Sequence, residues 1–313
     1  MTHNLAKLAL QAKSELLYRF NLVRHSHSLP ELEERDRLIV ETLKQEGVFV
    51  TTLDQLGLPS TSLMLKAVEG LLPTLPEALS SRKIDKRRTM SHAVNVSTKQ
   101  VTIKYPELFL WGLEERLLNI MERYIGLPVA YLGASIRKDL DTETQVGTRL
   151  WHTDGEDRRT LRVIVYLNDV DENGGPFEYI PRSLSPSYRS FKHIHCTIHD
   201  SDMEKVVPST QWKACCGPAG TVVIADASSV FHHGKVPKSE RTAIFLKYVS
   251  RQPKRPEACT SRFSQAELLS LSSQRLSKRQ KECVLWTPEL MAAYQQHEVA
   301  DIPQNAVLQM SES

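Results

Sequence analysis

The stretch that decides the fold is residues 161–167 (LRVIVYL), a run of aliphatic, β-branched and aromatic residues typical of a buried strand. Two further runs of this kind follow at residues 220–225 (GTVVIA) and 242–249 (TAIFLKYV). Turns rich in glycine and proline separate such runs, as in residues 173–176 (NGGP), and no helical pattern intervenes. Short strands connected in this way predict a barrel or a double-sheet jelly roll.

Helices are expected before this β-rich region. Residues 3–24 carry apolar residues at helical spacing, which predicts an amphipathic helix that packs on the core. A second helix is predicted to begin at a capping box formed by Ser28 and Glu31 and to end at Gly47. The β-branched and aromatic residues 47–51 then predict a strand.

The same periodicity predicts structure on either side of the central strands. Residues 106–126 indicate one helix, and residues 131–136 indicate a strand that leads into the β-rich region. Helices are expected again in the C-terminal part, where Ser264 and Glu267 have capping-box spacing and Pro288 suits a first helical position.

These patterns predict one mainly β domain with flanking helices (α+β) over residues 1–313. Residues 1–130 are expected to form a mainly helical support with one or more core strands, residues 131–250 a jelly-roll core carrying the functional site, and residues 251–313 a helical extension. A chain of this length has ample apolar material for such a core.

Composition excludes several classes of function. The net charge is +3, from 40 basic and 37 acidic residues, so the molecule has no strong overall field for nucleic acid or anionic lipid. No apolar run reaches the roughly 18–20 residues that cross a bilayer. The five cysteines show no C-x-x-C spacing and the first residues lack a secretory pattern, so we expect a reduced, cytoplasmic protein. The oligomeric state is left open.

His152 and Asp154 are the first candidates for chemistry. In an extended segment, residues two apart project to the same face, so both side chains can reach one metal ion. A second imidazole, from His232 or His233, would complete a two-histidine, one-carboxylate set of the kind found in non-haem Fe(II) oxygenases. The alternative to a metal site is a hydrogen-bonded loop, since the His-x-Asp pattern is common by chance.

Arg241 strengthens the first interpretation. It lies nine positions after His232, at the start of an apolar strand, where a cation is costly unless it is paired. A planar guanidinium binds a carboxylate through two hydrogen bonds, which suits a dicarboxylate cosubstrate. The alternative is a structural ion pair.

The combination of motifs resembles the phytanoyl-CoA dioxygenase family of Fe(II)- and 2-oxoglutarate-dependent oxygenases. The resemblance covers roughly residues 35–250. Its motifs are residues 45–50 (QEGVFV), 152–154 (HTD), 167–169 (LND), 171–176 (DENGGP), 179–183 (YIPRS), 220–226 (GTVVIAD), 232–234 (HHG) and Arg241.

The resemblance implies a double-stranded β-helix, a cupin-like jelly roll, that holds Fe(II) through His152, Asp154 and His232. It also implies that Arg241 binds the distal carboxylate of 2-oxoglutarate and that O2 is the second cosubstrate. Neighbouring strand residues face opposite ways, so only one of His232 and His233 is expected to coordinate. The family's usual His-x-Gly pattern and the spacing to the arginine favour His232.

The implied activity is hydroxylation of an unactivated C–H bond of a small molecule, with release of succinate and CO2. Relatives that halogenate replace the carboxylate ligand by a small residue, and here Asp154 fills that position. Desaturation and cyclisation stay open as outcomes, as do a non-catalytic ligand-binding or sensor protein on the same fold and a cupin-like enzyme that uses another metal. Both an anionic compound and a natural-product intermediate stay open as the substrate.

The chain departs from the family in two places. Residues 181–184 (PRSL) replace the usual Pro-Gly-Ser-His, and Gly234 and Ala243 offer no hydroxyl where many relatives assist the arginine. Thr148 and Thr160 are the candidate replacements.

Other polar clusters have weaker functional interpretations. The basic run at residues 82–88 suits a solvated loop better than a substrate site, and Cys215 and Cys216 suit buried packing. A zinc site from His193, His195, Cys196 and His199 matches no usual spacing. Arg158 and Arg159 are expected either at the barrel mouth or on the surface.

Overall fold

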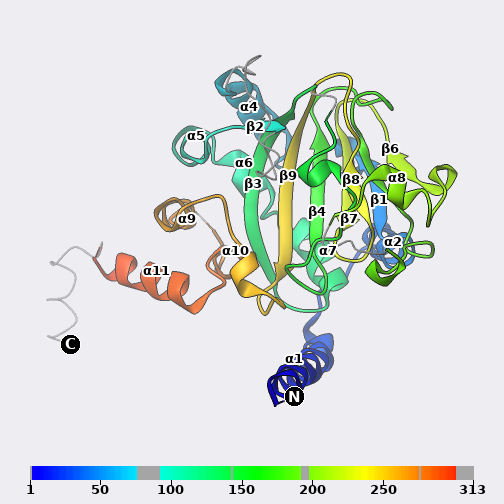
Figure 1. The fold of residues 1–313 in the computed structure, drawn as a ribbon. Helices are drawn as coiled ribbons and strands as arrows, with labels where there is room; N and C mark the ends of the chain where they lie inside the picture. The colour runs from blue at the N-terminus through cyan, green and yellow to red at the C-terminus, as the bar shows by residue number, and fades with distance from the viewer. Residues whose placement is uncertain (1, 76–91, 142–143, 192–196, 275, 301–313) are drawn as a thin grey trace, which may run out of the picture.

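The computed structural model describes residues 2–75, 92–141, 144–191, 197–274 and 276–300 (Figure 1). The basic run at residues 82–88 lies outside the described residues. So do three of the four residues of the weighed zinc cluster, His193, His195 and Cys196.

Two antiparallel sheets form the centre of the molecule (Figure 1). The six-stranded sheet has the order β1 (Val48–Thr52), β7 (Thr221–Asp226), β4 (Leu161–Tyr166), β9 (Arg241–Ser250), β3 (Val129–Asp139) and β2 (Ala93–Asn95). The three-stranded sheet has the order β6 (Lys213–Cys215), β5 (Phe177–Tyr179) and β8 (His232–Gly234). Single bridges add Trp151, opposite Ile198, and His152, opposite His232.

The chain passes back and forth between the two sheets. After β3 in the large sheet, the chain runs through Trp151 and His152, which lie beside β8 of the small sheet, and returns to the large sheet as β4. It then crosses to the small sheet as β5 and β6 and returns to the large sheet as β7. Finally it crosses to the small sheet as β8 and returns to the large sheet as β9. This alternation is the winding of a double-stranded β-helix, or jelly roll. The predicted fold class is therefore confirmed.

Helices surround the sheets. The helices that precede β3 are α1 (Thr2–His25), α2 (Glu34–Glu46), α3 (Leu53–Leu56), α4 (Thr61–Leu71), α5 (Thr98–Lys104), α6 (Glu107–Trp111) and α7 (Glu115–Ile125). The later ones are α8 (Asp200–Met203), α9 (Gln265–Ser272), α10 (Lys278–Val284) and α11 (Pro288–Ala300). Short 3-10 turns lie at Ser26–Ser28, Leu72–Thr74, Gly147–Arg149, Tyr188–Ser190, Ser209–Gln211 and Pro256–Ala258. No described helix is long and apolar enough to cross a membrane.

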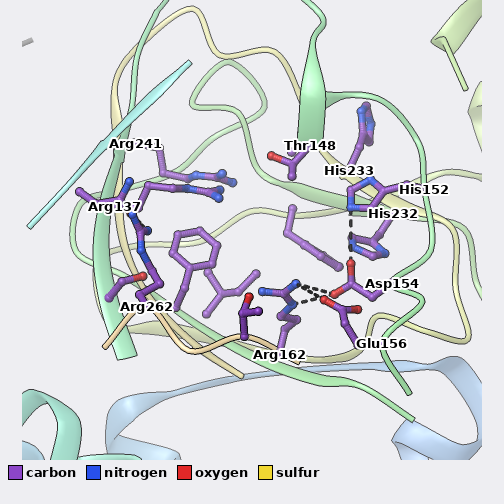
Figure 2. A pocket seen from close by; sticks show the side chains of 17 residues that line it. Arg137, Thr148, His152, Asp154, Glu156, Arg162, His232, His233, Arg241 and Arg262 are labelled. Carbon is purple, nitrogen blue, oxygen red and sulfur yellow. Dashed lines mark hydrogen bonds and ion pairs between the residues drawn. The ribbon is translucent and has the colours of Figure 1, made fainter. Parts of the chain in front are cut away.

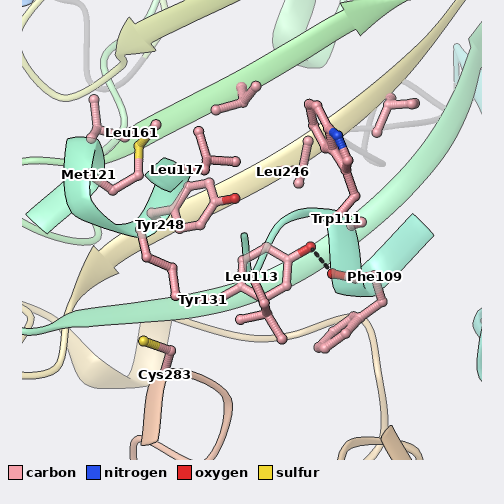
Figure 3. Packing of buried hydrophobic residues seen from close by; sticks show 14 of the residues in the cluster. Phe109, Trp111, Leu113, Leu117, Met121, Tyr131, Leu161, Leu246, Tyr248 and Cys283 are labelled. Carbon is pink, nitrogen blue, oxygen red and sulfur yellow. Dashed lines mark hydrogen bonds between the residues drawn. The ribbon is translucent and has the colours of Figure 1, made fainter. Parts of the chain in front are cut away.

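The main core lies between the six-stranded sheet and these helices (Figure 3). Tyr131 of β3 and Tyr248 of β9 stack there with ring centroids 5.1 Å apart, and Phe109 of α6 lies 5.0 Å from Tyr131. Leu117 and Met121 of α7 close the same cluster and are fully buried. A second, smaller core lies between the sheets and leaves space for a cavity at one end.

Several predicted helix boundaries are confirmed. Gly47 ends α2 in the left-handed region, with φ of 85° and its amide donating to the Leu43 carbonyl. Ser264 and Glu267 form the expected capping box of α9, and α11 begins at Pro288.

Two helix predictions are wrong. Ser28 lies in a 3-10 turn and α2 begins six residues later at Glu34, because Leu29, which precedes Pro30, takes the extended backbone that a following proline favours. The helix predicted over residues 106–126 is split into α6 and α7. It breaks at Gly112, where a side chain would collide with the Tyr131 ring.

The predicted packing of the first helix is also wrong for two of its apolar residues. In α1, Leu16 is 69% exposed and Leu17 is 56% exposed, whereas both were expected to pack on the core. Tyr18 and Leu22, one helical turn apart, make the partly buried contacts instead. The helix extends away from the sheets (Figure 1).

Candidate metal centre

His152 and His232 are brought together by backbone pairing. The amide of each residue donates to the carbonyl of the other, both over 3.0 Å, so they form a directly opposed antiparallel pair. Directly opposed residues project to the same face of a sheet. The two imidazole centroids are therefore 4.4 Å apart, although the residues lie eighty positions apart in the sequence.

Both imidazoles are oriented by the backbone. Nδ1 of His152 donates to the Leu150 carbonyl over 2.8 Å, and Nδ1 of His232 donates to the Val230 carbonyl over 3.1 Å. A carbonyl oxygen only accepts, so each Nδ1 carries the proton and each Nε2 keeps its lone pair. Both lone pairs are left for a ligand on the cavity side.

Asp154 completes the group (Figure 2). Its Oδ1 lies 3.7 Å from Nε2 of His152, and one ligand atom from each of the three side chains lies within 4.8 Å of the others. Its Oδ2 accepts a hydrogen bond from Nε of Arg162 over 2.8 Å and forms an ion pair with Nη2 of the same residue over 2.6 Å. One carboxylate oxygen is thus free to meet a metal ion. Within the described residues, this is the one such cluster that could hold a metal.

The protonation states suit a divalent cation. Burial lowers the pKa of His152, and burial together with the neighbouring His152 lowers the pKa of His232 to about 3. Burial disfavours the ionised form of Asp154, but Arg162 and the two imidazoles outweigh it and hold the pKa of this carboxyl below its usual range. At neutral pH the site therefore offers two neutral imidazoles and one carboxylate, as metal binding requires.

His233 has a different environment from its neighbour. Its Nδ1 donates to the Arg149 carbonyl over 2.9 Å, and its Nε2 lies 2.8 Å from Oε2 of Glu178. Its ring stacks on Trp151 with the centroids 4.0 Å apart. Both ring nitrogens already have partners, whereas His232 is the residue that meets His152 and Asp154.

A cavity of about 660 Å³ opens beside these residues, and Arg241 lies on its opposite wall (Figure 2). Arg241 is almost fully buried, and its Nε and Nη2 donate to Oδ2 of Asp139 over 3.1 and 2.6 Å. Its Nη1 donates to the Gly175 carbonyl. The arginine is thus in the structural ion pair that the sequence left open, and it also borders the cavity.

Sequence reasoning missed Arg137, which lines the cavity beside Arg241 (Figure 2). Its Nε and Nη2 lie 3.2 and 3.1 Å from the same Oδ2 of Asp139, so two buried guanidinium groups share one carboxylate oxygen. Burial lowers the pKa of Arg137 to about 10, and burial opposes ionisation of Asp139 while the two arginines hold its pKa below the usual range. Two guanidinium groups therefore line this wall of the cavity.

Arg162 was also missed, although a signal was present. It interrupts the aliphatic run of β4 at a position whose neighbours two apart, such as Ile164, face the cavity. A charge in such a run is costly unless it is paired. The same reasoning that selected Arg241 would have selected Arg162.

Other predicted residues lie elsewhere. Thr148 lines the cavity, whereas Thr160 is buried outside it. Arg158 pairs with Glu15 over 3.0 Å, and Arg159 donates to the Tyr124 carbonyl, so neither lines the cavity.

Two further predictions concern the adjacent cysteines and the weighed zinc cluster. Cys215 is buried, as expected, but Cys216 is exposed, so the prediction of buried packing is wrong for Cys216. The described member of the weighed zinc cluster, His199, is exposed and lies 3.2 Å from Oε1 of Gln145.

No protein-family model and no curated protein sequence matches this chain. Solved structures do match. One is EctD from S. alaskensis with 2-oxoglutarate and 5-hydroxyectoine, at 17% identity over 74% of this chain and 84% of EctD, with a TM-score of 0.47. Another is SnoK, a non-heme alpha ketoglutarate dependent carbocyclase from nogalamycin biosynthesis, at 20% identity over 71% and 85% of the two chains, with a TM-score of 0.46.

A third is HygX from Streptomyces hygroscopicus with nickel and 2-oxoglutarate, at 12% identity over 70% of this chain and 88% of HygX, with a TM-score of 0.44. Similarities this low assign neither a family nor an activity.

Proposed function

We propose that this protein is a non-haem Fe(II)- and 2-oxoglutarate-dependent dioxygenase that hydroxylates an unactivated C–H bond of a small molecule. The observation that carries the proposal is the joint placement of two groups across one cavity. His152, Asp154 and His232 converge on one wall, and Arg241 lies on the other. The phytanoyl-CoA dioxygenase family is the relationship that the sequence motifs favour.

The donor set fits Fe(II). Two neutral imidazole nitrogens and one carboxylate oxygen occupy one face of an ion, which leaves coordination positions for a chelating cosubstrate and for O2. Arg162 holds Oδ2 of Asp154 through a hydrogen bond and an ion pair, so the carboxylate presents Oδ1 alone. This preset orientation lowers the entropy lost when the ion binds.

The opposite wall fits the distal carboxylate of 2-oxoglutarate. Arg241 and Arg137 line this wall, and a planar guanidinium binds a carboxylate through two hydrogen bonds. Thr148 lines the same cavity and is the hydroxyl that we assign as a further contact. A volume of about 660 Å³ is in the range of small-molecule sites and has room for a substrate beside the cosubstrate.

When bound, ferrous iron with 2-oxoglutarate and O2 would supply an oxidant strong enough to take a hydrogen atom from an unactivated C–H bond, with release of succinate and CO2. The chain's own residues place the reactants. Ile164 and Phe177 line the cavity near the histidines and limit the access of water. Asp154 fills the position that a halide would need, which favours hydroxylation over halogenation. Desaturation and cyclisation remain alternatives from the same hydrogen abstraction.

Anaerobic titration tests the proposal. Protein with Fe(II) is expected to develop the weak visible absorption of a metal chelate when 2-oxoglutarate is added, and Asp154→Ala is expected to lose it. A folded wild-type protein that gives no band under these conditions would contradict the proposal.

Admission of O2 then separates an enzyme from a binding protein. The wild-type complex is expected to convert 2-oxoglutarate to succinate, which NMR detects, whereas Asp154→Ala is not. A chelate that is stable under air would favour the non-catalytic alternative.

A further inference from the structure

A second, smaller cavity lies beside the metal cavity. We call it the side pocket; its volume is about 170 Å³. It shares Ser135, Arg162, Phe245, Thr260 and Arg262 with the larger cavity, so the two spaces adjoin. In Figure 2, Arg262 lies on the side of Arg137, away from the histidines. A molecule could therefore extend from the metal centre into the side pocket.

Three cations border the side pocket. They are Arg162 of β4, Lys247 of β9 and Arg262, which follows β9. Arg162 and Lys247 are paired in register across the two strands, so their side chains share one face of the sheet. Neither Asp154 nor Glu156 lines this pocket.

The three cations differ in their partners. Arg162 is paired with Asp154, and Lys247 with Glu156. Nη1 of Arg262 instead donates to the neutral amide oxygen Oδ1 of Asn95 over 2.5 Å. Burial lowers the pKa of Arg262, and among the described residues no neighbouring carboxylate raises it. Arg262 is therefore the cation of the side pocket that an anionic ligand would neutralise.

The remaining walls fit one end of an acidic small molecule. The hydroxyls of Ser135 and Thr260 can each donate a hydrogen bond, and the Phe245 ring offers an apolar surface between the side pocket and the larger cavity. Arg137 stacks on this ring, with Cζ 3.9 Å from its centroid. Arg137, which lines the larger cavity, therefore helps to fix the position of the Phe245 ring.

We propose that the side pocket binds an anionic group of the substrate, a carboxylate or a phosphate, with Arg262 as the residue that selects it. This inference rests on the proposed function, since it takes the metal centre as the place of reaction. It narrows the substrate to a small acid whose charged end lies in the side pocket while a C–H bond lies at the metal. Specificity would then reside in the segment after β9, which supplies Thr260 and Arg262.

Inorganic phosphate is the probe that tests this proposal. Binding to the full chain is measured by calorimetry at constant ionic strength, first without metal and then with Mn(II) and saturating 2-oxoglutarate. Arg262→Gln is expected to weaken phosphate binding about tenfold or more, because a charge-assisted contact is lost. Arg262→Lys should restore part of it. Arg35→Gln, an exposed arginine on α2 that pairs with Glu33, is the matched control and should bind as wild type does.

The outcomes are distinct. Phosphate binding that 2-oxoglutarate abolishes would place the anion at Arg241, and binding that Arg262→Gln leaves unchanged would make it an adventitious ion only; either result overturns the proposal. So does an absence of phosphate binding by wild type. If instead the protein binds phosphate through Arg262 but takes up neither Mn(II) nor 2-oxoglutarate, the anion pocket stands and the proposed function fails.

Discussion

The two faces of the six-stranded sheet differ in role: one packs against the helices, and the other lines the cavities. On the outer face, Ile244 and Leu246 of β9 are fully buried in the main core against the helices. On the inner face of the same strand, Arg241 and Lys247 point toward the cavities and carry charge. The alternation of a strand thus separates residues that stabilise the fold from residues that bind ligands. A change at one position and a change at the next should have effects of different kinds.

The largest expected effect distinguishes two neighbouring histidines. His232→Ala should weaken Mn(II) binding by more than about a hundredfold, because it removes a proposed ligand, with a small change in Tm. His233→Ala removes the contacts to Glu178 and Trp151, so it should lower Tm and leave the metal ligands in place. Metal titration and thermal unfolding of both variants check this. The reverse pattern would assign the metal to His233.

Leu246→Ala should act on the outer face alone. Loss of a fully buried leucine costs about 2–5 kcal/mol in the free energy of unfolding. The affinity for 2-oxoglutarate should stay within about threefold of the wild-type value, because Leu246 does not line the metal cavity. Urea unfolding and calorimetry measure the two quantities. A large loss of 2-oxoglutarate affinity without a loss in the free energy of unfolding would contradict the different roles of the two faces.

Arg162→Gln should act on the inner face alone. It removes the hydrogen bond and the ion pair that hold Oδ2 of Asp154, so we expect Mn(II) affinity to fall by roughly tenfold to a hundredfold. Val163→Ala, at the next position on β4 and facing the core, is the matched control. It should lower stability and spare metal affinity. Equal metal affinity in wild type and Arg162→Gln would show that Asp154 needs no such support.

The smallest effect concerns pH. His92 is buried beside Asp139, and burial lowers its pKa to about 3 from a usual value of 6.5. Between pH 6.5 and pH 3, His92 is therefore protonated in the unfolded chain but not in the folded chain. The contribution of His92 to the free energy of unfolding is fully present above pH 6.5 and is lost as the pH falls toward 3. From pH 7.5 to pH 5 this amounts to about 2 kcal/mol. His92→Gln should remove that part of the pH dependence in urea unfolding; identical slopes in both proteins would contradict it.

The strands were predictable because their signals are local. The runs at residues 161–167 and 242–249 mark β4 and β9 to within one residue, and Gly47 marks the end of α2. Boundaries set by tertiary contacts were not. The break between α6 and α7 arises where Gly112 approaches Tyr131, and no local pattern shows that approach.

The candidate site was predictable in its strongest residues. The sequence pattern singled out His152, Asp154 and Arg241, and the family resemblance favoured His232 over His233; the structure brings His152, Asp154 and His232 together, with Arg241 across the cavity. Arg137 and Asp139 were missed, because a salt bridge to Arg241 depends on the pairing of β3 with β9. Strand pairing over such a distance has no signal in a single sequence.

The most direct test is a crystal structure grown with Mn(II) and 2-oxoglutarate, with anomalous scattering measured for the metal. The ion is expected at Nε2 of His152, Nε2 of His232 and Oδ1 of Asp154, with the distal carboxylate of 2-oxoglutarate at Arg241. A well-ordered crystal in which the metal lies elsewhere, or in which the dicarboxylate avoids the wall of Arg241, would contradict the account.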